Sequence, residues 1–161
     1  MKKIWSFALT LFLFNLAFSQ TKSNGLNVLE KENIAVVAKY YECLFKTRDF
    51  KTMVTLIADK AVYNQAEGLA YGGVYIGFGE WITMFTKAGT YYDLVIEKEP
   101  TYFTNDSKDE VIILFTIKCK SKKSGEIISM PISEHFELQS GKITAIRPFY
   151  FDTKAFANFL N

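Results

Sequence analysis

The feature of this chain that most constrains its fold is a change of hydrophobic period after Gly89. Before this glycine, apolar residues recur three and four positions apart, as they do on one face of a helix. After it, apolar and polar residues alternate with the period of two that is typical of strands, and the segments are separated by the turn signals NDSKD, KKSG and SG. Helices followed by a run of strands predict an α+β fold, with the helices on one face of a curved antiparallel sheet.

The N-terminal part predicts a helix over residues 33–45 and a second helix with Asp49 as its N-cap. A third helix is expected over about 79–87, and a last short helix after Asp152, which we interpret as another N-cap in preference to an acid at the pocket mouth. The second helix is expected to bury Phe50, Met53, Val54 and Ile57. Between the helices, 61–65 is a short strand, and the glycine-rich stretch 66–79 lacks the spacings of phosphate-binding loops, so we interpret it as a rim or lid.

The strand predicted over residues 110–121 is apolar on both faces for much of its length. Val111, Ile113 and Phe115 alternate with Ile112 and Leu114. A strand with this pattern is expected to be covered on both sides. We therefore expect a homodimer that packs through the outer face of the sheet, and the alternative is that the C-terminal segment folds across this face.

The first twenty residues have the pattern of a secretory signal peptide. Lys2 and Lys3 precede an apolar run that ends at Phe14, and small residues follow at Ala17 and Ser19. We expect residues 1–20 to be cleaved on export to the periplasm or the medium, residues 21–32 to be flexible, and residues 33–161 to form one domain. The apolar run is too short for a membrane anchor, and the mature chain is expected to have no membrane segment.

Composition excludes several classes of function. Of the 19 basic residues, Lys2 and Lys3 leave with the leader, so 17 basic residues face 17 acidic ones and no basic face points to nucleic acid. With His135 as the only histidine and no Cys-x-x-Cys pair, neither a metal site nor a cofactor is expected. Cys43 and Cys119 are the only cysteines, and we interpret them as buried free thiols in preference to a disulfide.

The order of these elements resembles the NTF2-like superfamily, and within it the SnoaL-like group. The resemblance covers about residues 33–160 and rests on three stretches: AKYYECLFKTRDFKTMVTLIADKAVYNQ, YIGFGEWITMF and HFELQSGKITAIRPFYFDT. It implies a cone, in which a bent antiparallel sheet wraps around three N-terminal helices and encloses an apolar pocket. It also implies dimers that pack through the outer sheet face.

Steroid isomerases of this superfamily provide a pattern for the site. They use a tyrosine on the first helix and a protonated acid on a late strand as an oxyanion hole, with an aspartate base after the second helix. The resemblance places Tyr41 at the tyrosine position, Gln65 near the base position, Ile132 or Glu134 at the late-strand acid, and Tyr150 at an aromatic that lines the pocket. Gln65 cannot accept a proton, which counts against this isomerase mechanism.

Strand parity gives an independent reason to single out Glu134. In the segment PISEHFELQ this carboxyl shares a face with Ile132, Phe136 and Leu138, so it is expected to point into the pocket, where burial would raise its pKa. The alternative is a position near the rim or a bond to a buried hydroxyl. His135 points to the outer face by the same parity, unless a bulge at Pro131 reverses it and makes His135 a catalytic candidate.

Further pocket residues are predicted with less support from the pattern. Tyr63, Trp81, Met84 and Tyr150 are candidates for an aromatic pocket wall, although for each one alone plain core is the preferred interpretation. Asn64 or Gln65 is expected to offer an amide contact. Arg147 is the only late-strand arginine, and its parity is opposite to that of Tyr150, so the Asp-Arg-Asp mechanism of the hydrolases in this superfamily does not apply.

Three functions remain open at this point. The first is an exported domain that binds a small, mostly apolar ligand in its cone. The second is an isomerase, cyclase or dehydratase in which Glu134 or His135 moves a proton and Tyr41 stabilises an oxyanion. The third is an assembly role, in which the outer sheet face is the working surface.

Overall fold

The computed structural model describes residues 26–105 and 108–161. The expected signal peptide at 1–20 lies outside these residues, as do the first five residues of the expected flexible segment. The elements in chain order are α1 (Val28–Tyr41), the π-helix η1 (Glu42–Thr47), α2 (Phe50–Thr55), β1 (Ile57–Gln65), β2 (Gly73–Ile76), α3 (Phe78–Tyr91), β3 (Tyr92–Asn105), β4 (Lys108–Ser121), β5 (Ile127–Gln139), β6 (Lys142–Tyr150) and α4 (Thr153–Leu160).

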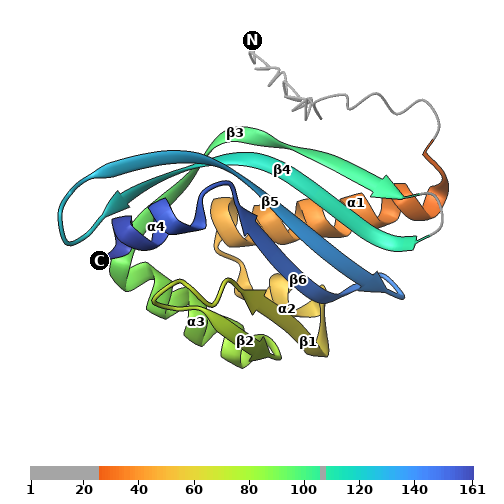
Figure 1. Ribbon diagram of the computed structural model, residues 1–161. Helices are drawn as coiled ribbons and strands as arrows, with labels where there is room; N and C mark the ends of the chain where they lie inside the picture. The colour runs from red at the N-terminus through yellow and green to blue at the C-terminus, as the bar shows by residue number, and fades with distance from the viewer. Residues whose placement is uncertain (1–25, 106–107) are drawn as a thin grey trace, which may run out of the picture.

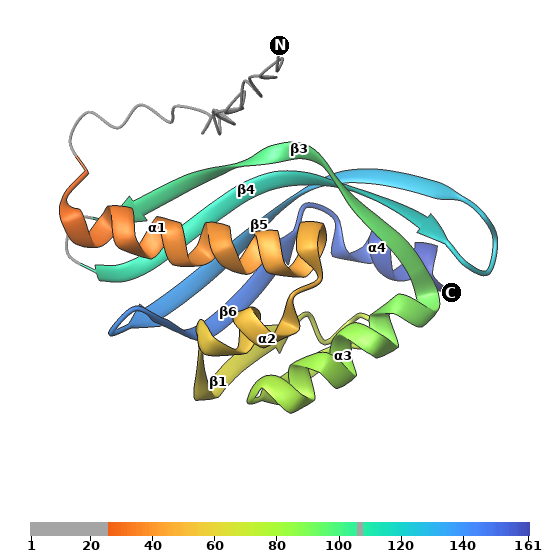
Figure 2. The same cartoon turned by 180° about the vertical axis from the view of Figure 1, so that it is seen from behind.

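The strands form one curved, unclosed sheet in the order β2-β1-β6-β5-β4-β3. Figure 1 shows β3, β4 and β5 as a long arch, and Figure 2 shows α1 running along the concave side of this arch. Helices α2 and α3 lie on the same side and close the space beneath the arch. The predicted α+β cone is confirmed. Because β1 and β6 pair in parallel, the sheet is mixed, whereas the sequence analysis expected antiparallel pairing throughout.

Helix α1 begins earlier than the sequence pattern indicates, directly after Asn27. Asn27 and Glu30 form a capping box, in which the Asn27 side chain accepts from the Glu30 backbone and the Glu30 carboxylate accepts from the Asn27 backbone. Buried Glu30 also accepts a hydrogen bond from Thr104, and buried Asn33 donates one to Asp109. These polar contacts fix the first two turns of α1 to the β3–β4 end of the sheet.

The two predicted aspartate N-caps are confirmed, but the predicted buried side of the second helix is partly wrong. Asp49 accepts from the Thr52 backbone and Asp152 from the Ala155 backbone. Helix α2 is only six residues long and buries a single side chain, Met53. Two of its other apolar side chains are exposed, Phe50 by 40% and Val54 by 41%, and Ile57 is the first residue of β1.

The core lies on the concave side of the sheet. In β4, Val111 and Ile113 are fully buried beneath the arch, whereas Ile112 and Leu114 on the convex face are 46% and 47% exposed. Helix α4 does not cover this convex face, because Phe156 stacks on Tyr150 at 4.9 Å and packs into the concave core. The alternative that the C-terminal segment covers the outer face is therefore wrong. Among the described residues, no helix is long and apolar enough to cross a membrane.

Candidate functional site

A cavity of about 360 Å³ lies between the concave face of the sheet and the helices. Its wall is built from η1 and the end of α1, from α3, and from the inward residues of β1, β3, β4, β5 and β6. Most of the lining side chains are aromatic or aliphatic, for example Phe45, Phe115 and Ile132. This volume and lining are typical of pockets for small organic molecules.

Glu134 is the only carboxyl group in the buried part of the described cavity wall. It lies on β5 between the inward residues Ile132 and Phe136, and its side chain is only 7% exposed. Tyr41 donates a hydrogen bond to Glu134 Oε2 at 2.5 Å, and Tyr63 donates a longer one to Oε1 at 3.5 Å. The carboxyl group therefore lies in the cavity wall with a tyrosine hydroxyl beside each of its oxygens.

Burial controls the ionisation of this group. Removal from water raises the pKa of Glu134 from 4.5 to about 7, although the hydrogen bonds from Tyr41 and Tyr63 act in the opposite direction. Burial, followed by the nearby Glu134 charge, raises the pKa of both tyrosines well above their usual value, so they remain protonated donors. Near neutral pH the carboxyl group exists in both forms, and it can donate a hydrogen bond or accept a proton.

A second polar group lies along the same cavity. The Tyr71 and Tyr92 hydroxyls are 2.8 Å apart, and Tyr150 and Gln65 complete this part of the wall. The Gln65 side-chain oxygen accepts from the Ala66 backbone at 2.9 Å, and this buried residue lines the cavity. The cavity thus offers neutral hydroxyl and amide groups in addition to the Glu134 carboxyl.

Six of the eight predicted site residues line this one cavity: Tyr41, Tyr63, Gln65, Met84, Glu134 and Tyr150. Trp81 does not, and its prediction as a ligand contact is wrong. It is fully buried behind Tyr63, with the two rings edge to face at 5.4 Å, and its indole N–H donates to the Tyr75 carbonyl at 3.2 Å. Trp81 therefore supports a cavity residue from the core and does not face a ligand.

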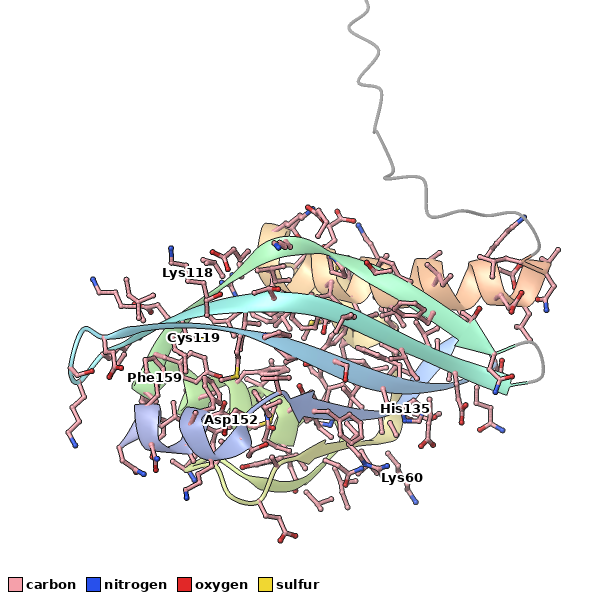
Figure 3. The ribbon with its side chains drawn as sticks, turned by 45° about the horizontal axis from the view of Figure 1, so that its top comes forward. Lys60, Lys118, Cys119, His135, Asp152 and Phe159 are labelled. Atoms are coloured by element: carbon pink, nitrogen blue, oxygen red, sulfur yellow. The ribbon has the colours of Figure 1, made fainter. Side chains whose placement is uncertain are left out.

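His135 also does not line the cavity. The pairing of β4 with β5 is continuous through Pro131, so the proposed bulge is absent from this pair and His135 stays on the convex face (Figure 3). Its Nε2 lies 3.8 Å from Glu110 Oε1. The hypothesis that His135 is catalytic in the pocket is therefore wrong. Asn64 also lies outside the cavity and lines a separate surface groove, to which Gln65 contributes as well.

Several residues that line the cavity were not predicted from the sequence. Tyr71 belongs to the glycine-rich stretch that we interpreted as a rim or lid, and Tyr92 is the first residue of β3, where the period changes. Arg48 lies at the mouth because it ends a π-helix in a left-handed conformation, with φ of 56°. No pattern in the sequence marks a π-helix, whereas the pair Tyr91–Tyr92 beside the period change was a usable signal for an inward tyrosine.

The remaining candidate groups are the two cysteines and a possible metal site. Cys43 and Cys119 are buried and unpaired, which confirms the interpretation as free thiols. Burial raises the pKa of Cys119 to about 12, so it is inert as a nucleophile. Within residues 26–105 and 108–161, no group of three or more histidine, cysteine or acidic residues is arranged to hold a metal ion.

Comparisons with known proteins agree with this architecture. No protein-family model and no curated protein matches the sequence. An NTF2-like protein of Burkholderia xenovorans is 17% identical, with a TM-score of 0.73 over 81% of this chain and 97% of that one. A candidate polyketide cyclase of Xanthomonas campestris is 16% identical, with a TM-score of 0.70 over 83% and 99%. TerC, co-crystallised with polyporic acid, is 17% identical, with a TM-score of 0.70 over 80% and 98%.

Proposed function

The chain has the NTF2-like fold, and we propose that it is a binding domain that holds a small, mostly apolar ligand in the cavity beneath the arch. We propose further that it acts outside the cytoplasm, after removal of residues 1–20. The observation that supports this most strongly is the cavity of about 360 Å³, in which aromatic walls surround one buried carboxyl group. Small-molecule binding sites are usually preformed, mostly apolar cavities with a few polar groups, as this one is.

The polar groups indicate how such a ligand is oriented. Glu134 has a pKa of about 7, so a protonated form exists near neutral pH. This form can donate a hydrogen bond to a ligand oxygen while Tyr41 and Tyr63 still donate hydrogen bonds to the carboxyl oxygens. Buried polar groups of this kind fix orientation, because a ligand that leaves them unpaired loses affinity. TerC, which has the same fold, was co-crystallised with polyporic acid, and this supports a small organic ligand here.

An enzyme is the second candidate, and the ionisation of Glu134 favours it. A carboxyl group with a pKa of about 7 is suited to general acid–base catalysis at neutral pH, and the adjacent Tyr41 hydroxyl would stabilise a developing oxyanion if it turned from Glu134 to the substrate. An isomerase, cyclase or dehydratase would use these groups. The reaction cannot use Gln65 as a base, and His135 faces away from the cavity, so Glu134 is the buried lining group that would transfer the proton.

We also propose a homodimer through the convex sheet face. Two neighbouring rows of cross-strand partners lie there: Phe103, Ile112, His135 and Arg147 in one row, and Thr101, Leu114, Ser133 and Phe149 in the other. Phe103, Ile112, Leu114 and Phe149 are large apolar side chains that remain about half exposed in one chain. A second copy would cover this patch, as is usual for contiguous exposed apolar surface.

The binding proposal is tested by native mass spectrometry of the mature protein from its own host, followed by organic extraction. The control is Ala88→Phe, which places a ring into the cavity from α3. We expect the wild-type protein to carry a small molecule that the variant lacks. A wild-type protein without any bound molecule, or a molecule that also remains on Ala88→Phe, would contradict binding in the cavity.

The extracted molecule also separates the binder from the enzyme. It is offered to wild-type protein and to Glu134→Gln, which keeps the size of the side chain but cannot exchange a proton. A binder retains the molecule unchanged with both proteins. An enzyme converts it with the wild type, and this conversion falls by about 100-fold or more with Glu134→Gln.

A further inference from the structure

The mouth of the cavity carries a cationic side chain that the proposed function leaves unexplained. Arg48 lines the cavity, and the rest of the described lining contains no other lysine or arginine. It lies between η1 and α2, opposite the junction of α3 and β3, from which Gly89, Asp93 and Leu94 line the mouth. Figure 2 shows these two parts of the chain facing each other beneath the arch.

The local backbone fixes the position of this arginine. The π-helix η1 widens the last turn after α1 and places Leu44 and Phe45 in the cavity wall. Arg48 follows with a φ of 56°, a conformation that is uncommon for residues other than glycine. Its Nη1 donates to the Leu44 carbonyl at 2.7 Å, so the guanidinium group is held across the end of η1, and its other N–H groups remain for a partner. Widened turns of this kind occur often at functional sites.

The neighbouring carboxylates are engaged elsewhere. Asp49 caps α2 through both its oxygens, which accept from the backbone and the hydroxyl of Thr52. Asp93, across the mouth, lies 3.3 Å from the Lys122 ammonium group. Within the described part of the chain, no carboxylate lies within 4 Å of the Arg48 guanidinium group. Since Asp93 is paired with Lys122, Arg48 is the charged lining residue without a carboxylate partner within 4 Å in the described part of the chain.

We propose that Arg48 binds an anionic group of the ligand at the mouth of the cavity, and that the ligand is therefore an amphipathic organic acid. This inference rests on the proposed binding function. The apolar body of the ligand lies against the aromatic wall, its carboxylate or sulfonate pairs with Arg48, and any uncharged oxygen at the inner end meets Glu134. Guanidinium groups suit this task because their planar fork matches the geometry of a carboxylate.

The reverse orientation of the ligand is unfavourable. An anionic group at the inner end would lie beside the Glu134 carboxyl group, in surroundings that already disfavour one negative charge. Such a ligand would lose its charge or lose affinity. The arrangement of Arg48 outside and Glu134 inside therefore selects both the class of ligand and its direction of entry.

Two fluorescent probes that differ in a single group test this proposal. 8-Anilinonaphthalene-1-sulfonate carries one sulfonate, and N-phenyl-1-naphthylamine has the same ring system without it. Both are titrated at low ionic strength into the wild-type protein and into Arg48→Gln, Arg48→Lys and Lys60→Gln. Lys60 is an exposed residue of β1 outside the cavity wall, so it provides the same change of charge at a distance from the mouth (Figure 3).

We expect Arg48→Gln to weaken binding of the sulfonate probe by about fivefold and to leave the neutral probe unchanged within twofold. Arg48→Lys is expected to restore part of the loss, Lys60→Gln to have no effect, and the difference between the probes to shrink at high salt. Equal effects of Arg48→Gln on both probes, or no effect on either, would overturn the proposal.

Binding of the two probes to Ala88→Phe tests the cavity independently of Arg48. Ala88→Phe should strongly weaken binding of both probes, because the added ring occupies part of the cavity. Probes that bind equally well to Ala88→Phe would contradict the proposed cavity function, whereas probes that bind in the cavity but do not distinguish Arg48→Gln would contradict only the inference about the anion.

Discussion

The concave and convex faces of the sheet differ in how deeply they bury neighbouring polar residues. Glu134 and His135 are adjacent on β5, yet Glu134 is buried beneath the arch and His135 lies outside, beside Glu110. On the concave face a carboxyl group is surrounded by aromatic rings, and burial shifts its pKa towards neutrality. On the convex face the polar residues remain partly hydrated and alternate with half-exposed apolar side chains.

The two apolar faces of β4 differ in the same way. The inward residues of β4 are almost completely buried by the chain itself, whereas its outward residues Ile112 and Leu114 remain 46% and 47% exposed. The same strand therefore lines the cavity on one side and carries the proposed dimer interface on the other.

The neighbouring pair Ile113 and Ile112 contrasts the two faces in a single chain. Ile113→Ala removes a fully buried side chain and is expected to lower the free energy of unfolding by about 2–5 kcal/mol. Ile112→Ala alters a side chain that is 46% exposed, and we expect a loss below about 1 kcal/mol in the monomer. Urea denaturation of both variants at low protein concentration measures these values, and similar losses would contradict the assignment of the faces.

The stability of the folded chain is expected to depend on pH through Glu134. Its pKa is raised from 4.5 to about 7 on folding, so between these values the folded state holds a proton that the unfolded state releases. Stability from this group is complete below pH 4.5 and is lost as the pH rises to about 7. The loss is about 3 kcal/mol in total, after which the curve levels off.

Glu134→Gln is the matched control for this pH dependence. We expect the variant to lack the decline between pH 4.5 and 7 and to be at least as stable as the wild type at pH 8, because it removes a buried charge. Urea denaturation across this pH range measures both curves. A variant that is less stable by several kcal/mol at pH 8 would mean that Glu134 is an ionised member of a buried network.

The convex face is tested by Leu114→Lys, which places a charge in the centre of the proposed interface. We expect the dimer dissociation constant to rise by about tenfold or more, because the charge would be buried between two copies. Sedimentation velocity measures it, and the monomer should keep its stability because Leu114 is 47% exposed. A wild-type protein that is monomeric at all accessible concentrations would contradict the interface.

The smallest expected effect distinguishes the two tyrosines on Glu134. Tyr41→Phe removes a hydrogen bond of 2.5 Å and should cost about 1 kcal/mol, whereas Tyr63→Phe removes one of 3.5 Å and should cost less than half as much. Both bonds lower the pKa of Glu134, so Tyr41→Phe should move the pH-dependent loss of stability to higher pH. An equal shift with both variants would show that the two bonds are equivalent.

Much of the fold could be predicted from the sequence because its signals are local. The change of period after Gly89 placed the strands, and Asp49 and Asp152 cap helices as their positions indicate. Strand parity placed Glu134 inward and His135 outward, because β5 pairs with β4 without a bulge. The parallel pairing of β1 with β6 could not be predicted, since it joins segments about eighty residues apart in the sequence.

The cavity wall was only partly predictable, because lining a cavity depends on three-dimensional curvature. Trp81 and Met84 share one buried face of α3, yet only Met84 reaches the cavity and Trp81 packs behind Tyr63. Helical periodicity cannot distinguish these two positions, as both are fully buried. Arg48 was missed for a different reason, since its position depends on a π-helix and a left-handed residue that carry no sequence signature.

The most direct test of the central claim is a carbon-13 spectrum of the glutamate carboxyl groups, recorded with and without N-phenyl-1-naphthylamine. The Glu134 signal is assigned by its loss in Glu134→Gln, and the signal of exposed Glu137 on the convex side of β5 is the internal control. The account predicts that the probe shifts the Glu134 signal and leaves the Glu137 signal in place. A Glu134 signal that does not move at saturating probe would contradict a ligand cavity centred on this residue.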